Sequence, residues 1–386
     1  GMYEFARVSA RPNSTSITLS TGLRNSYNNS GKTQVIRVPR YTTLTINSGR
    51  SITCPDWDGS TGGVVAVEAT QTVTINGSIN ANGKGFRGGV VEQNTVTPGT
   101  PSTYRTTSNA EGAEKGESIA GPASILGNGA FGRGAPANGG GGGNAHNGGG
   151  GGGSNAGSGT WTGNGNPDNS NANWTTAWNL ESVGFSSTTS PGGGRGGYSW
   201  SSNGRNPITT APGNAGWGGD NRQNSGGFGG RNLDNASTTR VFLGGGGGAG
   251  DSNNNTGTSG ADGGGIVFVV AKGNIGGTGS VTANGDTPPN TSSCTTCYGD
   301  AAGGGGGGGS VVMHSLTGSL STISISANGG NGGSQNIITT TGECESPGGG
   351  GGGGYIATSP RTGVTVTVNG GNNGHTDSPP MVNFTP

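Results

Sequence analysis

The stretch that decides the fold is GGGGGGGSVVMHSLTGSLSTISISANGG, residues 303–330. Seven consecutive glycines make a poor α-helix, because each glycine costs about 1 kcal/mol relative to alanine, and they bring no side chains to a β-strand. The apolar segment Ser310–Met313 and the strict alternation of Ile323–Ser326 are typical of strands. Asn328-Gly329 then indicates a turn.

The same order of glycines, strand, alternating strand and Ala-Asn-Gly recurs along the chain. The last glycine of the run and the alanine of Ala-Asn-Gly are 18 positions apart in three copies: Gly63 to Ala81, Gly265 to Ala283 and Gly309 to Ala327. A shortened copy follows Gly348–Gly354, and residues 41–46 are a candidate partial first coil. Such copies stack, because stacking buries apolar faces that one copy alone leaves exposed.

The glycine runs themselves have two interpretations. Glycine makes up 91 of the 386 residues, with runs at Gly139–Gly143, Gly148–Gly153, Gly244–Gly248, Gly303–Gly309 and Gly348–Gly354. A flexible linker is the simpler alternative. Packed polyglycine II helices, with three residues per turn and close backbone contact, suit runs that lead directly into strands. We therefore predict an all-β, irregular, loop-rich fold in which stacked strand repeats join a polyglycine II bundle, with essentially no α-helix.

Alternating glycine runs and sequence-diverse polar segments, over roughly Gly62 to Gly374, resemble the distal tip adhesins of T-even-type phage long tail fibres. The stretch from Cys344 through Gly348–Gly354 to Ile356 also resembles, more weakly, the glycine-rich ectodomain of the anaplastic lymphoma kinase receptor. The first resemblance implies a layered polyglycine II core. It concerns architecture and glycine context, and it transfers no site residue.

Two regions lie outside the regular repeat. Residues 1–61 form an expected β-rich cap or attachment region, with strand-like pieces at 15–20, 33–38 and 41–46, ahead of a glycine-rich domain at 62–386. Within that domain, residues 89–262 form a long insertion, which we expect to continue the array and to carry loops. Loops on a rigid scaffold commonly hold recognition residues.

Aromatic residues concentrate in this insertion. The candidates for ligand contact lie in segments rich in Asn, Ser and Thr: Trp161, Trp174, Trp178, Tyr198 and Trp200. An aromatic face flanked by hydrogen-bonding groups suits a sugar or a protein loop, although packing is an equally balanced alternative for the tryptophans. Trp217 and Phe228, inside glycine-rich stretches, are predicted to cover the core.

The four cysteines precede glycine runs, so stacking is expected to gather them at one end. We expect a disulfide between Cys344 and either Cys294 or Cys297, with Cys54 as the fourth cysteine. A zinc half-site at Cys294-x-x-Cys297 is the alternative, but no second such pair accompanies it.

Charge and catalytic motifs exclude several functional classes. The formal net charge is zero, from 19 basic and 19 acidic residues, which disfavours nucleic-acid binding. Neither catalytic residues nor a cofactor is expected. The three histidines, His146, His314 and His375, fit no triad, and the carboxylates Glu111, Glu114 and Glu117 around Lys115 are interpreted as solvated loop charge rather than a glycan-hydrolysing pair.

These observations predict a non-enzymatic receptor-binding adhesin, extracellular, on a cell surface or at a virion fibre tip. Its expected partner is a bacterial surface glycan or outer-membrane protein, with a fibre shaft protein or a homotrimer as a further association. Two alternatives stay open: an ice-binding protein, by resemblance to flat polyglycine II antifreeze proteins, and a purely structural fibre or surface module. The bulky polar insertion argues against the flat face that ice binding requires.

Overall fold

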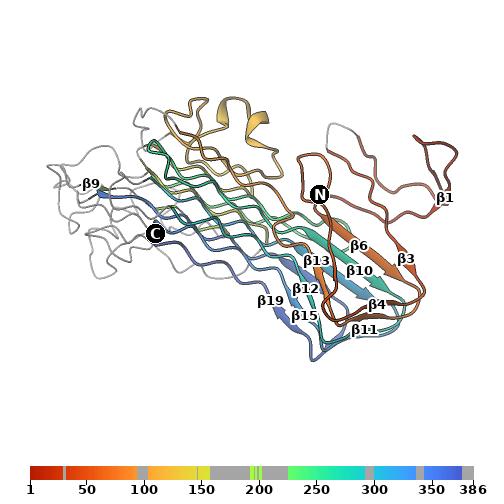
Figure 1. The fold of residues 1–386 in the computed structure, drawn as a ribbon. Coiled ribbons are helices and arrows are strands. Elements are labelled where there is room, and N and C mark those ends of the chain that lie inside the picture. The colour runs from red at the N-terminus through yellow and green to blue at the C-terminus, as the bar shows by residue number, and fades with distance from the viewer. Residues whose placement is uncertain are drawn as a thin grey trace.

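The structure, a computed structural model, describes residues 1–28, 32–93, 103–145, 147–156, 192–194, 196–197, 200–201, 225–291, 300–335 and 343–375. A stack of short strands forms one end of the molecule, and extended glycine-rich segments continue from it as a bundle (Figure 1). The far end of this bundle, where β9 lies in Figure 1, is called the distal end below.

Five coils, each of three short strands, build the stack. They are β3 (Arg40–Tyr41), β4 (Leu44–Ile46) and β5 (Ser51–Ile52); β6 (Val64–Ala69), β7 (Val73–Ile75) and β8 (Ser78–Asn80); β10 (Ile266–Ala271), β11 (Ile275–Gly276) and β12 (Ser280–Thr282); β13 (Ser310–Ser315), β14 (Leu320–Ser321) and β15 (Ser324–Ser326); and β17 (Tyr355–Thr358), β18 (Arg361–Thr362) and β19 (Thr365–Thr367). We number these coils 1 to 5 in chain order.

Each coil adds one strand to each of three five-stranded sheets. The strand orders are β17-β13-β10-β6-β3 in the first sheet, β18-β14-β11-β7-β4 in the second and β19-β15-β12-β8-β5 in the third. All neighbours within these sheets are parallel and in register, so that Val269 pairs with both Val67 and Met313. The predicted repeat is thereby confirmed, and residues 41–46 do belong to a first coil.

The three sheets enclose one apolar core. Alternation along each strand turns every second side chain inward, so Ile79, Val281 and Ile325 on the third sheet are fully buried. The first and second sheets bury Val267, Ile275 and Leu320 in the same way. One coil could not bury these side chains, and the stack is therefore the unit that folds.

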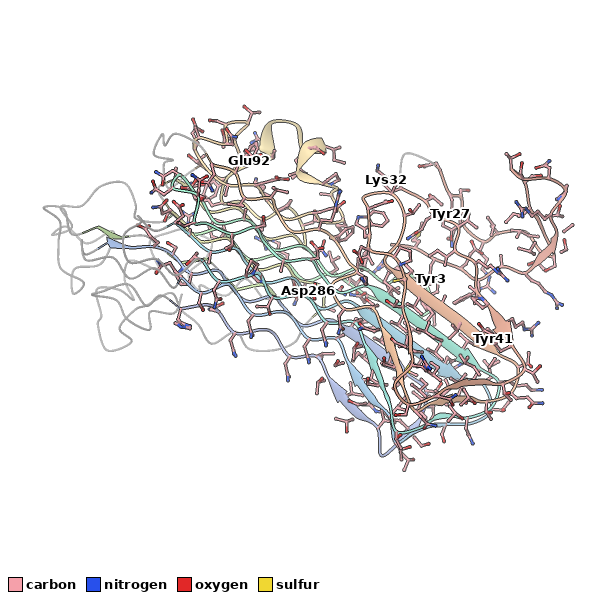
Figure 2. The ribbon with its side chains drawn as sticks, in the orientation of Figure 1. Tyr3, Tyr27, Lys32, Tyr41, Glu92 and Asp286 are labelled. Atoms are coloured by element: carbon pink, nitrogen blue, oxygen red, sulfur yellow. The ribbon has the colours of Figure 1, made fainter. Side chains whose placement is uncertain are left out.

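The N-terminal segment covers the outer face of the first sheet. Tyr3 lies over this sheet (Figure 2), with its ring centroid 4.6 Å from that of Phe268. A second apolar cluster under this cover contains Trp57, Val241 and Leu243. Before coil 1, β1 (Val8–Ala10) and β2 (Thr18–Leu19) pair antiparallel, whereas residues 33–38, predicted as a strand, lie in none. The predicted boundary at residue 61 falls between coil 1 and coil 2.

Hydrogen bonds in the bundle repeat every three residues. The N–H groups of Gly149 and Gly152 both donate to the segment at 192–197, at 3.2 and 2.9 Å. Gly150 and Gly153 both donate to the segment at 301–309. Gly151 and Ser154 donate to the segment at 138–144. Three residues per turn with no hydrogen bonds inside the segment is the geometry of polyproline II helices.

Carbonyl groups of the same central segment, 148–154, accept from three further segments. These neighbours are 226–230, 349–352 and 245–251. The segment is therefore surrounded by six others, and each of its backbone groups points at one of them. This arrangement confirms the predicted polyglycine II bundle and shows that the described parts of the insertion at 89–262 continue it.

Regular helix is almost absent from the described residues. Two short 3-10 turns occur, η2 (Ala123–Ile125) and η3 (Gly127–Gly129). At the distal end, β9 (Trp200–Ser201) pairs antiparallel with β16 (Glu343–Cys344). A helix of the length and apolarity needed to cross a membrane is not found in the described part of the chain.

Candidate recognition surfaces

The described segments meet at the distal end of the bundle. Gln335 N–H donates to the carbonyl of His375 at 2.8 Å, and Thr291 N–H donates to Ser334 at 3.0 Å. Nearby in the bundle, the Gln93 side chain donates to the Ser252 hydroxyl. Eight ends of described segments therefore lie at this side of the molecule, at residues 93, 201, 225, 291, 300, 335, 343 and 375. Three pairs of these ends flank the same gap in the described ranges: 201 and 225, 291 and 300, and 335 and 343.

A buried carboxylate orders the loop at 252–256 near the distal end. Asp300 is fully buried, and its two oxygens accept the N–H groups of Asn253, Asn254 and Thr256 at 2.9 to 3.2 Å. The Ser252 and Thr256 hydroxyls also donate to Asp300, each at 2.9 Å. Five donors for one carboxylate fix the loop conformation, since each bond to an ionised acceptor is stronger than a neutral one.

Asp251 lies beside Asp300. Its carboxylate accepts the Asn147 N–H at 2.8 Å, yet only 5% of the residue is exposed. Burial, more than the neighbouring Asp300 charge, raises the pKa of Asp251 to about 7, while the Asn147 N–H acts in the opposite direction. The distal end thus contains a carboxyl group that changes charge near neutral pH.

One of the five aromatic candidates lies in the described part of the chain. Trp161, Trp174, Trp178 and Tyr198 lie outside the described residues, and Trp200 lies on β9 at the distal end. The first three fall between Ala156 and Gly192, the described residues on either side. Ala156 N–H donates to Gly353, next to β17.

Of the two predicted core aromatics, Phe228 is described and its burial is confirmed. It is 8% exposed, and the Tyr104 ring stacks on it with centroids 5.8 Å apart. The guanidinium carbon of Arg133, a fully buried residue, lies 4.9 Å from the Phe228 centroid. Trp217 lies outside the described residues.

The outer face of the third sheet is a regular array of short polar side chains, here called the hydroxyl face. One column crosses all five coils, and a second crosses coils 2 to 5: Ser51, Ser78, Ser280, Ser324 and Thr365, then Asn80, Thr282, Ser326 and Thr367. Eight of these nine side chains carry a hydroxyl, and none is charged. In-register strands place them about 4.8 Å apart across the sheet and about 6.7 Å apart along it.

An asparagine ladder extends this face toward the distal end. Asn82 Oδ1 accepts the N–H of Asn284 at 2.8 Å, and Asn284 and Asn328 repeat the contact with the next coil. Three residues further along, Asn331 accepts the N–H of Asn372 at 2.9 Å. Side-chain oxygens therefore bond neighbouring segments in the layer that leaves the third sheet, where Asp286 is labelled in Figure 2.

The carboxylates Glu114 and Glu117 do not occupy a solvated loop, which corrects the expectation for this cluster. Residues 113–117 belong to the bundle, because Ala113 and Gly116 donate to Gly143 and Gly140, again three residues apart. Glu117 is 3% exposed and accepts bonds from Trp57 Nε1 at 3.0 Å and Arg87 Nε at 2.8 Å. Burial also lowers the pKa of Lys115 to about 8.

The two described cysteines, Cys54 and Cys344, do not lie at the same end, contrary to expectation. Cys54 is a free thiol that packs against the core of the coil stack. Cys344 lies on β16 at the distal end. The predicted disulfide partners Cys294 and Cys297 lie outside the described residues, so the disulfide stays a prediction. The spacing to a glycine run does not fix an end, because successive segments of the bundle run in both directions.

Two histidines each form a hydrogen bond with one serine hydroxyl. His314 Nδ1 lies 2.7 Å from Ser359 Oγ on coil 5, and His375 Nδ1 lies 3.0 Å from Ser334 Oγ in the ladder layer. His146 lies outside the described residues. Within the described ranges, no group of three or more His, Cys, Asp or Glu side chains is arranged to hold a metal ion.

Sequence reasoning missed the hydroxyl face, although its signal is present. Once the copies are aligned on Ala-Asn-Gly, the alternating strand of each copy has Ser or Thr at nearly every outward position. Alternation within one copy identifies the buried residues, whereas the polar array is visible only when the copies are aligned with one another. Comparisons with protein-family models, curated proteins and solved structures gave no match for this chain.

Proposed function

We propose that the protein is a non-enzymatic receptor-binding adhesin, in which the glycine bundle is a rigid support and the segments joined at its distal end make contact. The observation that carries this proposal is the convergence of segment ends at 93, 201, 225, 291, 300, 335, 343 and 375 on one side of the bundle. Segments anchored by a hydrogen-bonded scaffold lose less conformational entropy on binding.

The expected receptor is a bacterial surface glycan or an outer-membrane protein. The segments concerned are rich in Ser, Thr, Asn and Gly with interspersed aromatics, a composition suited to adaptable polar contacts around a few rigid rings. Neutral net charge favours recognition by stacking and hydrogen bonding over attraction to a polyanion.

The test is a glycan array combined with pull-down from bacterial surface extracts. Replacing residues 203–223 by a Gly/Ser linker of equal length should abolish capture, while Ser280→Ala on the hydroxyl face should leave it unchanged. Blank arrays and pull-downs at high protein concentration would refute the proposal. Capture lost equally in both variants would place the contact elsewhere.

Ice binding is the second candidate, and the hydroxyl face favours it. All five strands of the third sheet belong to coils, and the described part of residues 89–262 contributes no strand to it. A rigid, uncharged grid of hydroxyls at regular strand spacing is suited to ordering water into a lattice.

Thermal hysteresis and inhibition of ice recrystallisation test this candidate. Thr282→Lys, at the centre of the hydroxyl face, should abolish either activity. Thr74→Lys, an outward residue of the second sheet with similar partial exposure, should retain it. Absence of both activities in the wild-type protein would eliminate ice binding without affecting the adhesin proposal.

A further inference from the structure

The two ends of the coil stack differ in how well they cover the core. In coil 1, Leu44 and Ile46 remain buried, at 9% and 4% exposure, and only Ile52 is partly buried. In coil 5, Ile356, Val364 and Val366 are only partly buried, although their counterparts one coil earlier are at most 1% exposed. Among the described residues, the apolar core therefore continues to the coil 5 end without a full cover.

Backbone groups of coil 5 also point away from the stack. Tyr355 and Ser359 donate to coil 4 or the glycines before it, at 2.9 and 3.0 Å, and Thr365 donates to Ile323. Alternation along a strand then directs the N–H groups of Ile356 and Val366 outward. Coil 5 thus forms the edge of three sheets at once.

The asparagine ladder is open at the same edge. Each asparagine from Asn82 to Asn328 accepts an N–H from the next coil, and Asn369 is the last in this row. None of the described residues donates to Asn369 Oδ1. Sheet edges are usually protected by lysine or other charges, yet Arg361 is the one permanently charged residue between 355 and 375.

Stacking of coils does not depend on their being close in sequence. Coils 2 and 3 pair along six residues of β6 and β10, from Val64 opposite Ile266 to Ala69 opposite Ala271, although 202 positions separate each pair. Backbone pairing and packing between their strand edges, rather than a short connection, hold the two coils together. A coil from another chain can offer a matching strand edge in the same way.

We propose that coil 5 is a self-association surface, which pairs with coil 5 of a second copy of this chain about a two-fold axis. A two-fold contact brings identical edges together, and their strands then run antiparallel. It would cover Ile356, Val364 and Val366, and the near absence of charge removes repulsion between the two copies. The burial of Leu44 and Ile46 in coil 1 makes a head-to-tail filament the less favourable arrangement.

The test is the mass of the purified protein in solution across a concentration series, by light scattering and sedimentation. We expect a concentration-dependent species of twice the 37.4 kDa chain mass. Val366→Lys should raise the dissociation constant at least about a hundredfold, because it buries an unpaired charge at the contact. Thr282→Lys, on the hydroxyl face of coil 3 and two coils away from the edge, should leave dimerisation unchanged.

Hydrogen exchange tests the proposal without relying on a variant. In the wild-type protein, exchange of the peptides covering 355–368 should slow as concentration rises, while exchange at coil 3 stays constant. A monomer at every concentration, a growing filament, or a Val366→Lys protein that still dimerises would each overturn the proposal.

Discussion

Gly150 faces Gly248 so closely that a Cβ atom on Gly150 would stand 2.0 Å from the Gly248 carbonyl oxygen. Real Cβ atoms essentially never approach another heavy atom within 3.0 Å. The obstacle is backbone, held by neighbouring segments on all sides, and it has no flexible end that could move aside. Glycine at this position is therefore a packing requirement.

Gly150→Ala should destabilise the protein by at least about 3 kcal/mol, at the upper end of overpacking costs. Gly370→Ala is the matched control, because a Cβ there would meet its nearest atom at 3.4 Å, an ordinary contact, and should change stability by less than about 0.5 kcal/mol. Thermal or denaturant unfolding measures both. Equal melting of the two variants would contradict a packed bundle and favour flexible glycine runs.

Thr322 should be a site of stabilising substitution. The corner after the second sheet needs a positive φ, and coils 3 and 5 meet this need with Gly277 and Gly363, whereas coil 4 places Thr322 there at 59°. A β-branched residue is strained in that region, so Thr322→Asn should gain about 1 kcal/mol. Thr362→Asn, one residue before the corner of coil 5, should be neutral. No gain in the denaturation midpoint of Thr322→Asn would show that its hydroxyl bond to Gly277 offsets the strain.

Asp251 should make the protein less stable as pH rises through neutrality. Its pKa is about 7 in the folded protein against an unfolded value of 3.8, so the folded state holds the proton more tightly. This contribution is complete below about pH 4 and is lost as pH rises through about 7. Asp251→Asn should remove that loss and melt above the wild-type protein at pH 8.

The control for this pH dependence is Asp58→Asn. Asp58 is exposed, and hydrogen bonds from the Thr61 and Ser60 N–H groups lower its pKa, so it stays ionised between pH 4 and 8. Its substitution should leave the slope of melting temperature against pH unchanged in that range. If Asp251→Asn follows the wild-type slope, another group is responsible for the titration.

Glu117 should be a strong stability determinant. Glu117→Ala removes the acceptor of the Trp57 indole N–H and of Arg87 in a buried setting, and we expect a loss of about 3 kcal/mol. Glu111→Ala, in the same stretch but partly exposed, should cost less than about 1 kcal/mol. Chemical denaturation compares them, and similar small losses would support a solvated cluster after all.

Local sequence patterns predicted much of the architecture. The 18-position interval identified coils 2 to 4, and the alternation of Ile323–Ser326 identified which side chains face the core. Both depend on features that act within a few residues. The candidate site was less accessible, since four of the five aromatic candidates lie outside the described residues and the hydroxyl face requires the copies to be compared with one another.

The sequence by itself predicted that the glycine runs are ordered polyglycine II helices and that the copies stack, because missing Cβ atoms and period-two alternation are properties of the local chain. Tertiary structure alone decided which six segments surround residues 148–154, that Glu117 and Lys115 are buried, and that Cys54 and Cys344 lie apart. These outcomes depend on contacts between residues that are far apart in the sequence, as Val64 and Ile266 are. Patterns within a few residues do not specify such contacts.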